Sequence, residues 1–219
     1  REATAVCDAV FTAWTPPEQF AIARASARAG SKARARDGFA AVPLMTLTSQ
    51  DRFSYAMVLS RLNADTKAAE TYASVKSPAK LALAARYQRA RSLLSAGDGT
   101  TARSVLQALA RSGSDTSAAA ALSLIADLQT DTGDDAAARA TLLSLTKRFP
   151  STRFAAPARF DAALIALILG NAKTASHEFE KLAVASPGLA VASVYWAGRA
   201  LEAAGDSAAA RAAWADVLR

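Results

Sequence analysis

Three arginines and two tyrosines are the residues of this chain best suited to bind a ligand. An arginine guanidinium forms forked hydrogen bonds with a carboxylate, and the face of a tyrosine ring can stack on a sugar or a peptide. Together they predict a groove for a carboxylate-bearing or glycan ligand. The alternative is that the aromatic rings pack between structural units and that the arginines are solvated. The five candidates are Arg24, Arg91, Arg199, Tyr87 and Tyr195.

The residues that usually carry catalysis or bind metals are scarce and scattered in this sequence. Cys7 is the only cysteine and His177 the only histidine, which excludes an intrachain disulfide and a His/Cys zinc site. Glu178 and Glu180 are two residues apart in an expected helix, so they point to different sides of it. We therefore expect no catalytic residue, no metal site and no cofactor in this chain.

The candidate residues belong to a pattern that recurs six times, at intervals of 33 to 37 residues. Counted from each turn residue, the position seven before is small, the position five after is alanine and the position nine after is bulky. The position ten before is aromatic in five copies. A period of about 34 residues with this pattern is typical of a helix–turn–helix solenoid. The turn residues are Gly30, Asn63, Gly97, Gly133, Gly170 and Gly205.

Packing explains the small positions, and backbone conformation explains the turns. Small residues seven before and five after a turn can face each other where the two helices cross, which lets the axes approach closely. The bulky positions nine and twelve after the turn fill the gap to the next pair. Glycine suits the left-handed end of a helix, and a following Asp, Asn or Ser can cap the next one, as in Asp134-Asp135.

The pattern predicts an all-α, right-handed α-solenoid of about six helix pairs. It resembles the tetratricopeptide repeat family in the small/large pair of each second helix and in the closing prolines Pro150 and Pro187. It departs from that family in lacking the signature tryptophan early in the first helix. We expect one solenoid over 1–219, with an orphan helix at 1–15 and repeats at about 17–43, 50–78, 79–113, 116–150, 154–187 and 189–219.

Both ends of the sequence are expected to be cut from a longer protein. The orphan helix has no partner, and Trp214 and Val217 in the last helix still need a neighbour. No signal peptide opens this chain. Its longest uncharged apolar run, 162–169, is far shorter than the ~20 residues of a membrane span.

The net charge of +7 is concentrated in the first half of the chain. Residues 1–112 contain 16 Lys or Arg and 8 Asp or Glu, whereas residues 113–219 contain 10 and 11. A basic half can attract nucleic acid, an acidic lipid surface or a cell wall; the alternative is a set of solvated helix faces. Nucleic acid ranks third among the ligands, because the basic stretch from Arg24 to Arg36 has no interleaved aromatic residues and no reader motif.

The last repeat carries a more specific resemblance. The segment Tyr195-Trp196-Ala197-Gly198-Arg199-Ala200-Leu201 and the Gly205-Asp206 turn after it resemble the helical repeats of soluble lytic murein transglycosylases. The resemblance covers roughly residues 149–219. It implies a bacterial periplasmic location and a superhelical domain that holds glycan strands near a separate catalytic domain. The Glu-Ser pair of that catalytic domain is absent from this sequence.

Two functions follow from these resemblances. The first is the non-catalytic superhelical region of a lytic transglycosylase, which would guide peptidoglycan glycan strands or bind partners. The second is a tetratricopeptide-type scaffold for protein partners in cell-envelope assembly, with no enzyme attached.

Overall fold

The computed structural model describes residues 15–112 and 116–217, and within these ranges it contains 12 α-helices and two short 3-10 helices. The prediction of an all-α chain built from sequential helix pairs is confirmed. The orphan helix expected at 1–15, with Cys7, lies outside the described residues except for Thr15. The pairs are α2 Pro16–Ala29 with α3 Lys32–Ala40, α4 Ser49–Arg61 with α5 Asp65–Ala73, α6 Ala79–Ser95 with α7 Gly99–Arg111, α8 Thr116–Asp131 with α9 Asp135–Arg148, α10 Ala155–Ile168 with α11 Ala172–Ala185, and α12 Ala190–Ala203 with α13 Ser207–Val217. The 3-10 helices are η1 Leu44–Thr46 and η2 Pro187–Leu189.

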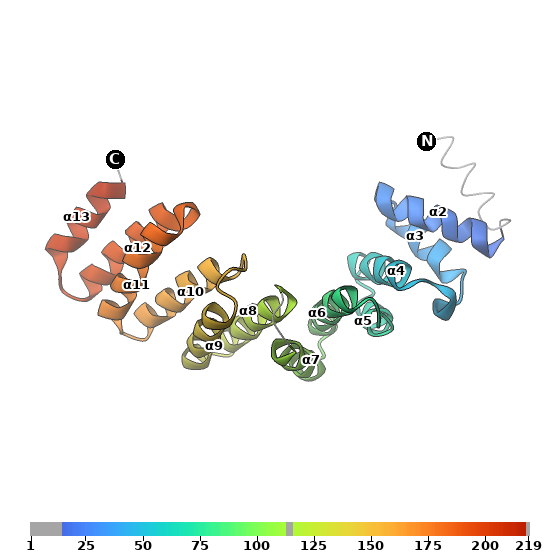
Figure 1. The fold of residues 1–219 in the computed structure, drawn as a ribbon, viewed down its shortest axis with the longest axis horizontal. Coiled ribbons are helices and arrows are strands. Elements are labelled where there is room, and N and C mark those ends of the chain that lie inside the picture. Colours follow the sequence, from blue (N-terminus) through green and yellow to red (C-terminus); the bar gives the residue numbers. More distant parts are fainter. Residues whose placement is uncertain (1–14, 113–115, 218–219) are drawn as a thin grey trace. The chain divides into compact units, whose positions relative to one another are not determined.

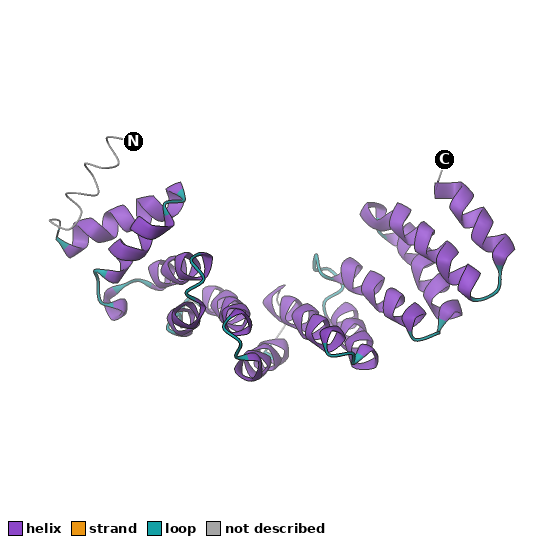
Figure 2. Ribbon diagram, turned by 180° about the vertical axis from the view of Figure 1, so that it is seen from behind, coloured by secondary structure: helices purple, strands orange, loops and turns teal. Residues whose placement is uncertain are grey.

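The chain consists of two compact units, residues 1–105 and 106–219, and each is described by itself. In the first unit α2 packs on α3, α4 on α5, and α5 on α6; α4 also contacts both α2 and α6. In the second unit each helix from α8 to α13 packs on the next, and α10 also contacts α12. Figure 1 and Figure 2 show the paired helices within each unit. First helices of neighbouring pairs therefore touch each other at α2 and α4, at α4 and α6, and at α10 and α12.

The small positions around each turn lie where the two helices of a pair cross. The eleven alanines seven residues before or five residues after a turn are all at most 2% exposed. Their burial is what close packing of the two helices of a pair requires. They are Ala23, Ala35, Ala56, Ala68, Ala90, Ala102, Ala126, Ala138, Ala163, Ala175 and Ala210.

The last pair has a glycine at the twelfth small position, and its partner explains the change. A Cβ added at Gly198 would fall against the indole of Trp214, 2.7 Å from its Cδ1. The Trp214 Nε1–H also donates a hydrogen bond of 3.2 Å to the carbonyl of Tyr195. The Trp214 ring therefore lies on α12 of its own pair and is half-buried there; the expectation that it needs a further neighbour stays a prediction.

Three of the aromatic residues ten before a turn contact the bulky ring of their own helix pair; the alternative that these aromatic residues pack between pairs stays a prediction. Each of these three lies edge-on to the bulky residue nine after the same turn, and two of the bulky rings in turn stack on a residue of the next pair. The edge-on pairs are Phe20–Phe39 at 5.8 Å, Phe53–Tyr72 at 5.4 Å and Phe160–Phe179 at 5.2 Å between ring centroids, and the stacked pairs are Phe39–Tyr55 at 5.3 Å and Phe179–Trp196 at 6.4 Å.

The turn chemistry matches the sequence at all six turns and the capping at three of them. The turn residues, five glycines and Asn63, all have positive φ angles between 58° and 87°, the left-handed conformation that favours glycine. Asp98, Asp134 and Asp206 each accept a hydrogen bond from the backbone N–H three residues later, at 3.0 to 3.1 Å. Ser31 and Asn171 make no such bond with their side chains, so the prediction that they cap is wrong.

Candidate functional site

In the first unit, the predicted groove residue Arg24 is already engaged by the protein. Its Nε lies 3.2 Å from Oδ1 of Asp51, whose side chain is only 6% exposed. The guanidinium also lies 5.9 Å from the centre of the Phe20 ring. Asp51 in turn accepts a 2.5 Å hydrogen bond from the hydroxyl of Thr48, the residue that caps α4. Arg24 therefore ties α2 to the start of α4.

The other two candidates of the first unit lie one turn apart on α6. Arg91 is exposed, and its Nη1 lies 3.4 Å from Oε1 of Gln88. Tyr87 is half-buried. Arg91 is thus more available to a ligand than Arg24, although both stand six residues before a turn.

The two candidates of the second unit lie one turn apart on α12. Tyr195 is 42% exposed and meets the Trp196 ring edge-on, with 5.7 Å between the centroids. Arg199 is exposed, and its Nε lies 3.7 Å from Oε2 of Glu202 on the same helix. Arg24, Tyr87 and Arg91 belong to the other unit. A continuous groove that joins all five candidates stays a prediction.

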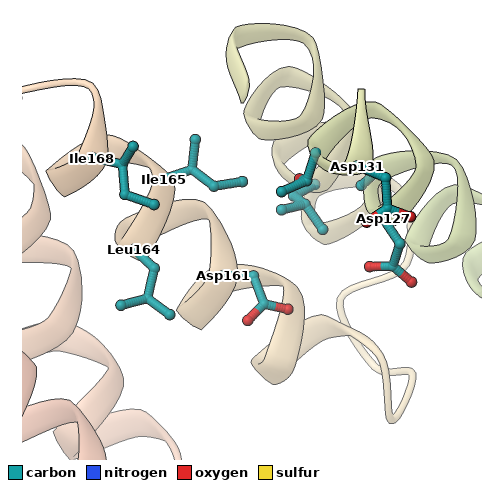
Figure 3. A pocket seen from close by; sticks show the side chains of 9 residues that line it. Asp127, Asp131, Asp161, Leu164, Ile165 and Ile168 are labelled. Carbon is teal, nitrogen blue, oxygen red and sulfur yellow. The ribbon is translucent and has the colours of Figure 1, made fainter. Parts of the chain in front are cut away.

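The second unit contains a pocket that none of the five predicted residues lines. It has a volume of about 470 Å³ and lies between α8 and α10, the first helices of two neighbouring pairs, with α9 contributing one residue. Its sides carry carboxylates and its floor is mostly aliphatic (Figure 3). The lining residues are Ala126, Asp127, Thr130, Asp131, Leu142, Asp161, Leu164, Ile165 and Ile168.

Helical spacing explains why these side chains share the pocket. Asp127 and Asp131 are four residues apart on α8, and Asp161 precedes Leu164 and Ile168 by three and seven residues on α10, so each set follows one helix face. In Figure 3 the two aspartates of α8 stand across the pocket from the isoleucines and Leu164 of α10.

The position within the repeat could have identified part of this pocket from the sequence. Asp127 and Leu164 stand six residues before their turns, the same offset as the three candidate arginines. A search along that offset for acidic as well as basic residues would have included Asp127. Asp131 and Asp161 stand at other offsets, two and nine before a turn, and only the packing of α10 beside α8 reveals that they join it.

The carboxylates of the pocket are exposed to solvent and have no cationic partner among the residues that the structure describes. Burial raises the pKa of Asp127, and the like charge of Asp131 raises it further. Burial also raises the pKa of Asp161, with a second contribution from the charge of Asp127. Within 15–112 and 116–217, no hydrogen bond or ion pair connects these three carboxylates to a donor. The pocket is therefore a place of negative potential that a bound cation would relieve.

Neither a metal centre nor a membrane span is found in the described parts of the chain. No group of three or more His, Cys, Asp or Glu side chains there is arranged to hold a metal ion, and this includes the three pocket aspartates. None of the helices that the structure describes is long and apolar enough to cross a membrane. On α11, His177 and Glu180 are exposed, and Glu178 pairs with Lys181 at 3.6 Å.

Comparisons with known proteins agree with the observed architecture. Residues 120–152, which cover most of α8 and α9, match the family model described as tetratricopeptide repeat. A search of the curated proteins found no match. Among solved structures, the C-terminal part of a TPR repeat-containing protein from Cytophaga hutchinsonii is 17% identical, with a TM-score of 0.72 over 99% of this chain and 88% of that chain.

Two further structures show the same likeness. A tetratricopeptide repeat protein from Parabacteroides merdae is 16% identical, with a TM-score of 0.63 over 93% of this chain and 79% of that one. YrrB, described as a TPR protein with an unusual peptide-binding site, is 16% identical, with a TM-score of 0.56 over 78% and 85%. None of these structures is described as a lytic transglycosylase. The chain has the fold of tetratricopeptide repeat proteins, and residues 120–152 match the repeat that defines them.

Proposed function

We propose that this chain is a non-catalytic protein-interaction module that binds a segment of a partner protein in the pocket between α8 and α10. The observation that carries the proposal is the pocket itself, which is concave and mainly aliphatic, with a few polar groups at its sides. Concave sites of this size and character are the usual places where proteins bind ligands.

Exposed apolar side chains around the pocket support this proposal. Ile168 is 69% exposed at the end of α10, and the neighbouring Leu169 is exposed as well. Apolar surface next to a pocket with polar sides is typical of a protein-binding site. The likeness to YrrB, a TPR protein described as having a peptide-binding site, is consistent with a peptide as the ligand.

A peptide selection with a matched pair of variants tests the proposal. The complete chain is used to select binders from a random linear peptide library, and affinities are measured by fluorescence anisotropy. Ile168→Ser should weaken the selected peptides about tenfold, because it removes an exposed apolar contact beside the pocket. The control is Val184→Ser on α11, since Val184 is 87% exposed and does not line the pocket. No selected peptide, or equal loss in both variants, would contradict the proposal.

A second candidate function is the superhelical region of a periplasmic lytic transglycosylase that guides glycan strands or binds envelope partners. The observation that favours it is on α12, where exposed Tyr195 and Arg199 lie one turn apart inside the segment that resembles those enzymes. An aromatic face beside a guanidinium suits a glycan strand with carboxylate-bearing peptide stems.

Sedimentation with purified cell-wall sacculi separates the two candidates. Guidance of glycan strands predicts salt-sensitive binding that weakens when Arg24, Arg91 and Arg199 are changed to alanine. Arg91→Ala and Arg199→Ala should contribute more than Arg24→Ala, because the Arg24 guanidinium is already paired with Asp51. A chain that binds selected peptides but leaves the sacculi in the supernatant would be a protein scaffold alone.

A further inference from the structure

We infer that the pocket between α8 and α10 binds a lysine or arginine side chain of the partner, with an adjacent apolar residue resting on the exposed end of α10. This inference rests on the proposed function and specifies the partner's chemistry. It combines the aliphatic floor of the pocket with the negative charge of its sides.

The charges of the pocket call for a cation. Asp127 and Asp131 approach from α8 and Asp161 from α10, so a positive group between the helices would be near carboxylates of both (Figure 3). The described residues supply no ion pair to any of the three. Since these aspartates are not arranged to hold a metal ion, an ammonium or a guanidinium is the better fit. A guanidinium would also form forked hydrogen bonds with a carboxylate.

The apolar lining selects a long basic side chain over a small inorganic cation. Leu142 and Ala126 are buried beneath the pocket, and Leu164 and Ile165 contribute aliphatic surface from α10. Lysine and arginine bury their methylene stems along such surface while the charged head reaches polar groups. The strongly exposed Ile168 then offers a contact for an apolar neighbour of the basic residue.

The same features disfavour other partner chemistries. A segment rich in carboxylates or phosphates would bring further negative charge to aspartates that already repel each other. A purely apolar segment would cover the carboxylates without compensating their charge, which is costly. A basic and apolar segment satisfies both parts of the lining.

The peptide library provides the test of the partner's chemistry. The complete wild-type chain should select peptides with Lys or Arg at one fixed position next to an apolar residue. The double variant Asp127→Asn/Asp161→Asn should lose that basic preference. The control is Glu178→Gln/Glu180→Gln, which removes the same charge from the same unit outside the pocket and should keep the preference.

The affinities of one selected peptide and its variant then test whether the charge of the basic residue contributes to binding. Replacing its basic residue with norleucine, which keeps the aliphatic stem, should weaken binding to the wild type about tenfold or more. The same replacement should change little for the Asp127→Asn/Asp161→Asn variant.

Three outcomes would overturn the inference, and they are distinguishable. Peptides without a basic position whose binding still depends on Ile168 would refute the basic partner and leave the proposed function standing. Equal loss in the pocket and control variants would mean long-range attraction without a defined pocket contact. If the chain selects no peptide at all, the inference and the proposed function fail together.

Discussion

The first helices of the first unit and those of the two pairs that form the pocket share one scaffold but differ in charge. Six residues before a turn, the first unit has Arg24 and Arg91, whereas the two pairs that form the pocket of the second unit have Asp127 and Leu164. The charge of Arg24 is compensated inside the protein, by the nearly buried Asp51. Asp127 lies near the like charges of Asp131 and Asp161, and no ion pair joins it to any residue that the structure describes.

The repeat therefore determines the position of a side chain on the helix surface, whereas the residue type at that position differs between repeats. An internally paired charge stabilises the fold, whereas an unpaired cluster in a pocket destabilises it slightly and is available to a ligand. Substitutions that act on the two regions should therefore change stability in opposite directions.

The largest effect is expected in the first unit, from Asp51→Ala. It leaves the Arg24 guanidinium without its partner and removes the acceptor of the Thr48 hydroxyl at the start of α4. Loss of a nearly buried, hydrogen-bonded charge should lower the free energy of unfolding by about 2 to 4 kcal/mol. Urea denaturation followed by circular dichroism measures it. A change below about 0.5 kcal/mol would mean that the Asp51 pair is not structural.

The next effect tests whether both units obey the same packing rule at the helix crossing. Gly198→Ala should destabilise the last pair by about 1 to 3 kcal/mol, because its Cβ would overlap the Trp214 ring. In the background Trp214→Leu, which places at this position the residue that two other pairs have, the same change should cost much less. Thermal unfolding of the four variants gives the coupling, and additive effects would contradict the assigned contact.

A smaller effect separates the two arginines of the first unit. Arg24→Ala should cost about 1 kcal/mol, through the lost pair with Asp51 and the lost contact with Phe20. Arg91→Ala should cost less than about 0.5 kcal/mol, since its side chain makes only a long contact with Gln88. Comparable losses in urea denaturation would remove the distinction between an engaged and an available arginine.

The smallest effect has the opposite sign and belongs to the pocket. Asp161→Asn should stabilise the chain at neutral pH by a few tenths of a kcal/mol, a modest figure because the side chain is solvent-accessible. The pKa of Asp161 is raised on folding, so its carboxylate destabilises the fold once ionised. That cost is absent below the unfolded pKa, near 4, and develops as the pH rises through the folded pKa.

Thermal unfolding of Asp161→Asn and wild type at about pH 3 and pH 7 checks this sign. The stabilisation should be present at neutral pH and vanish in acid. A variant that is less stable than wild type at neutral pH would show that Asp161 has a favourable partner, and the contrast between the units would fail.

The sequence predicts those parts of the fold that depend on contacts within one helix pair. Alanines at the crossing and left-handed turn residues follow from local sterics, and the same requirement is repeated six times. The partners of the aromatic residues cannot be assigned from the sequence. Spacing alone does not distinguish a contact of Phe20 with Phe39 in its own helix pair from a contact with the next helix pair. Capping also varied: Asp98 and Asp134 bond to the helix start, but Ser31 does not.

The candidate site was predicted only in part, for a physical reason. The offset six residues before a turn identifies a face that includes Asp127 and Leu164, but the prediction of a groove for a carboxylate-bearing ligand names only the arginines at this offset. Asp161 joins the pocket only because both α8 and α10 pack on α9, which brings their side chains to one pocket. A contact between side chains of different repeats has no signature in the spacing of either one.

The most direct test of the central claim is a titration of the isotope-labelled chain with a selected basic peptide, followed by amide chemical shifts. Binding in the pocket predicts that the largest shifts fall on α8 and α10, around Asp127, Asp161 and Ile168, and that they are lost in Asp127→Asn/Asp161→Asn. Largest shifts on α12 around Tyr195 and Arg199, or on the helices of the first unit, would contradict the account.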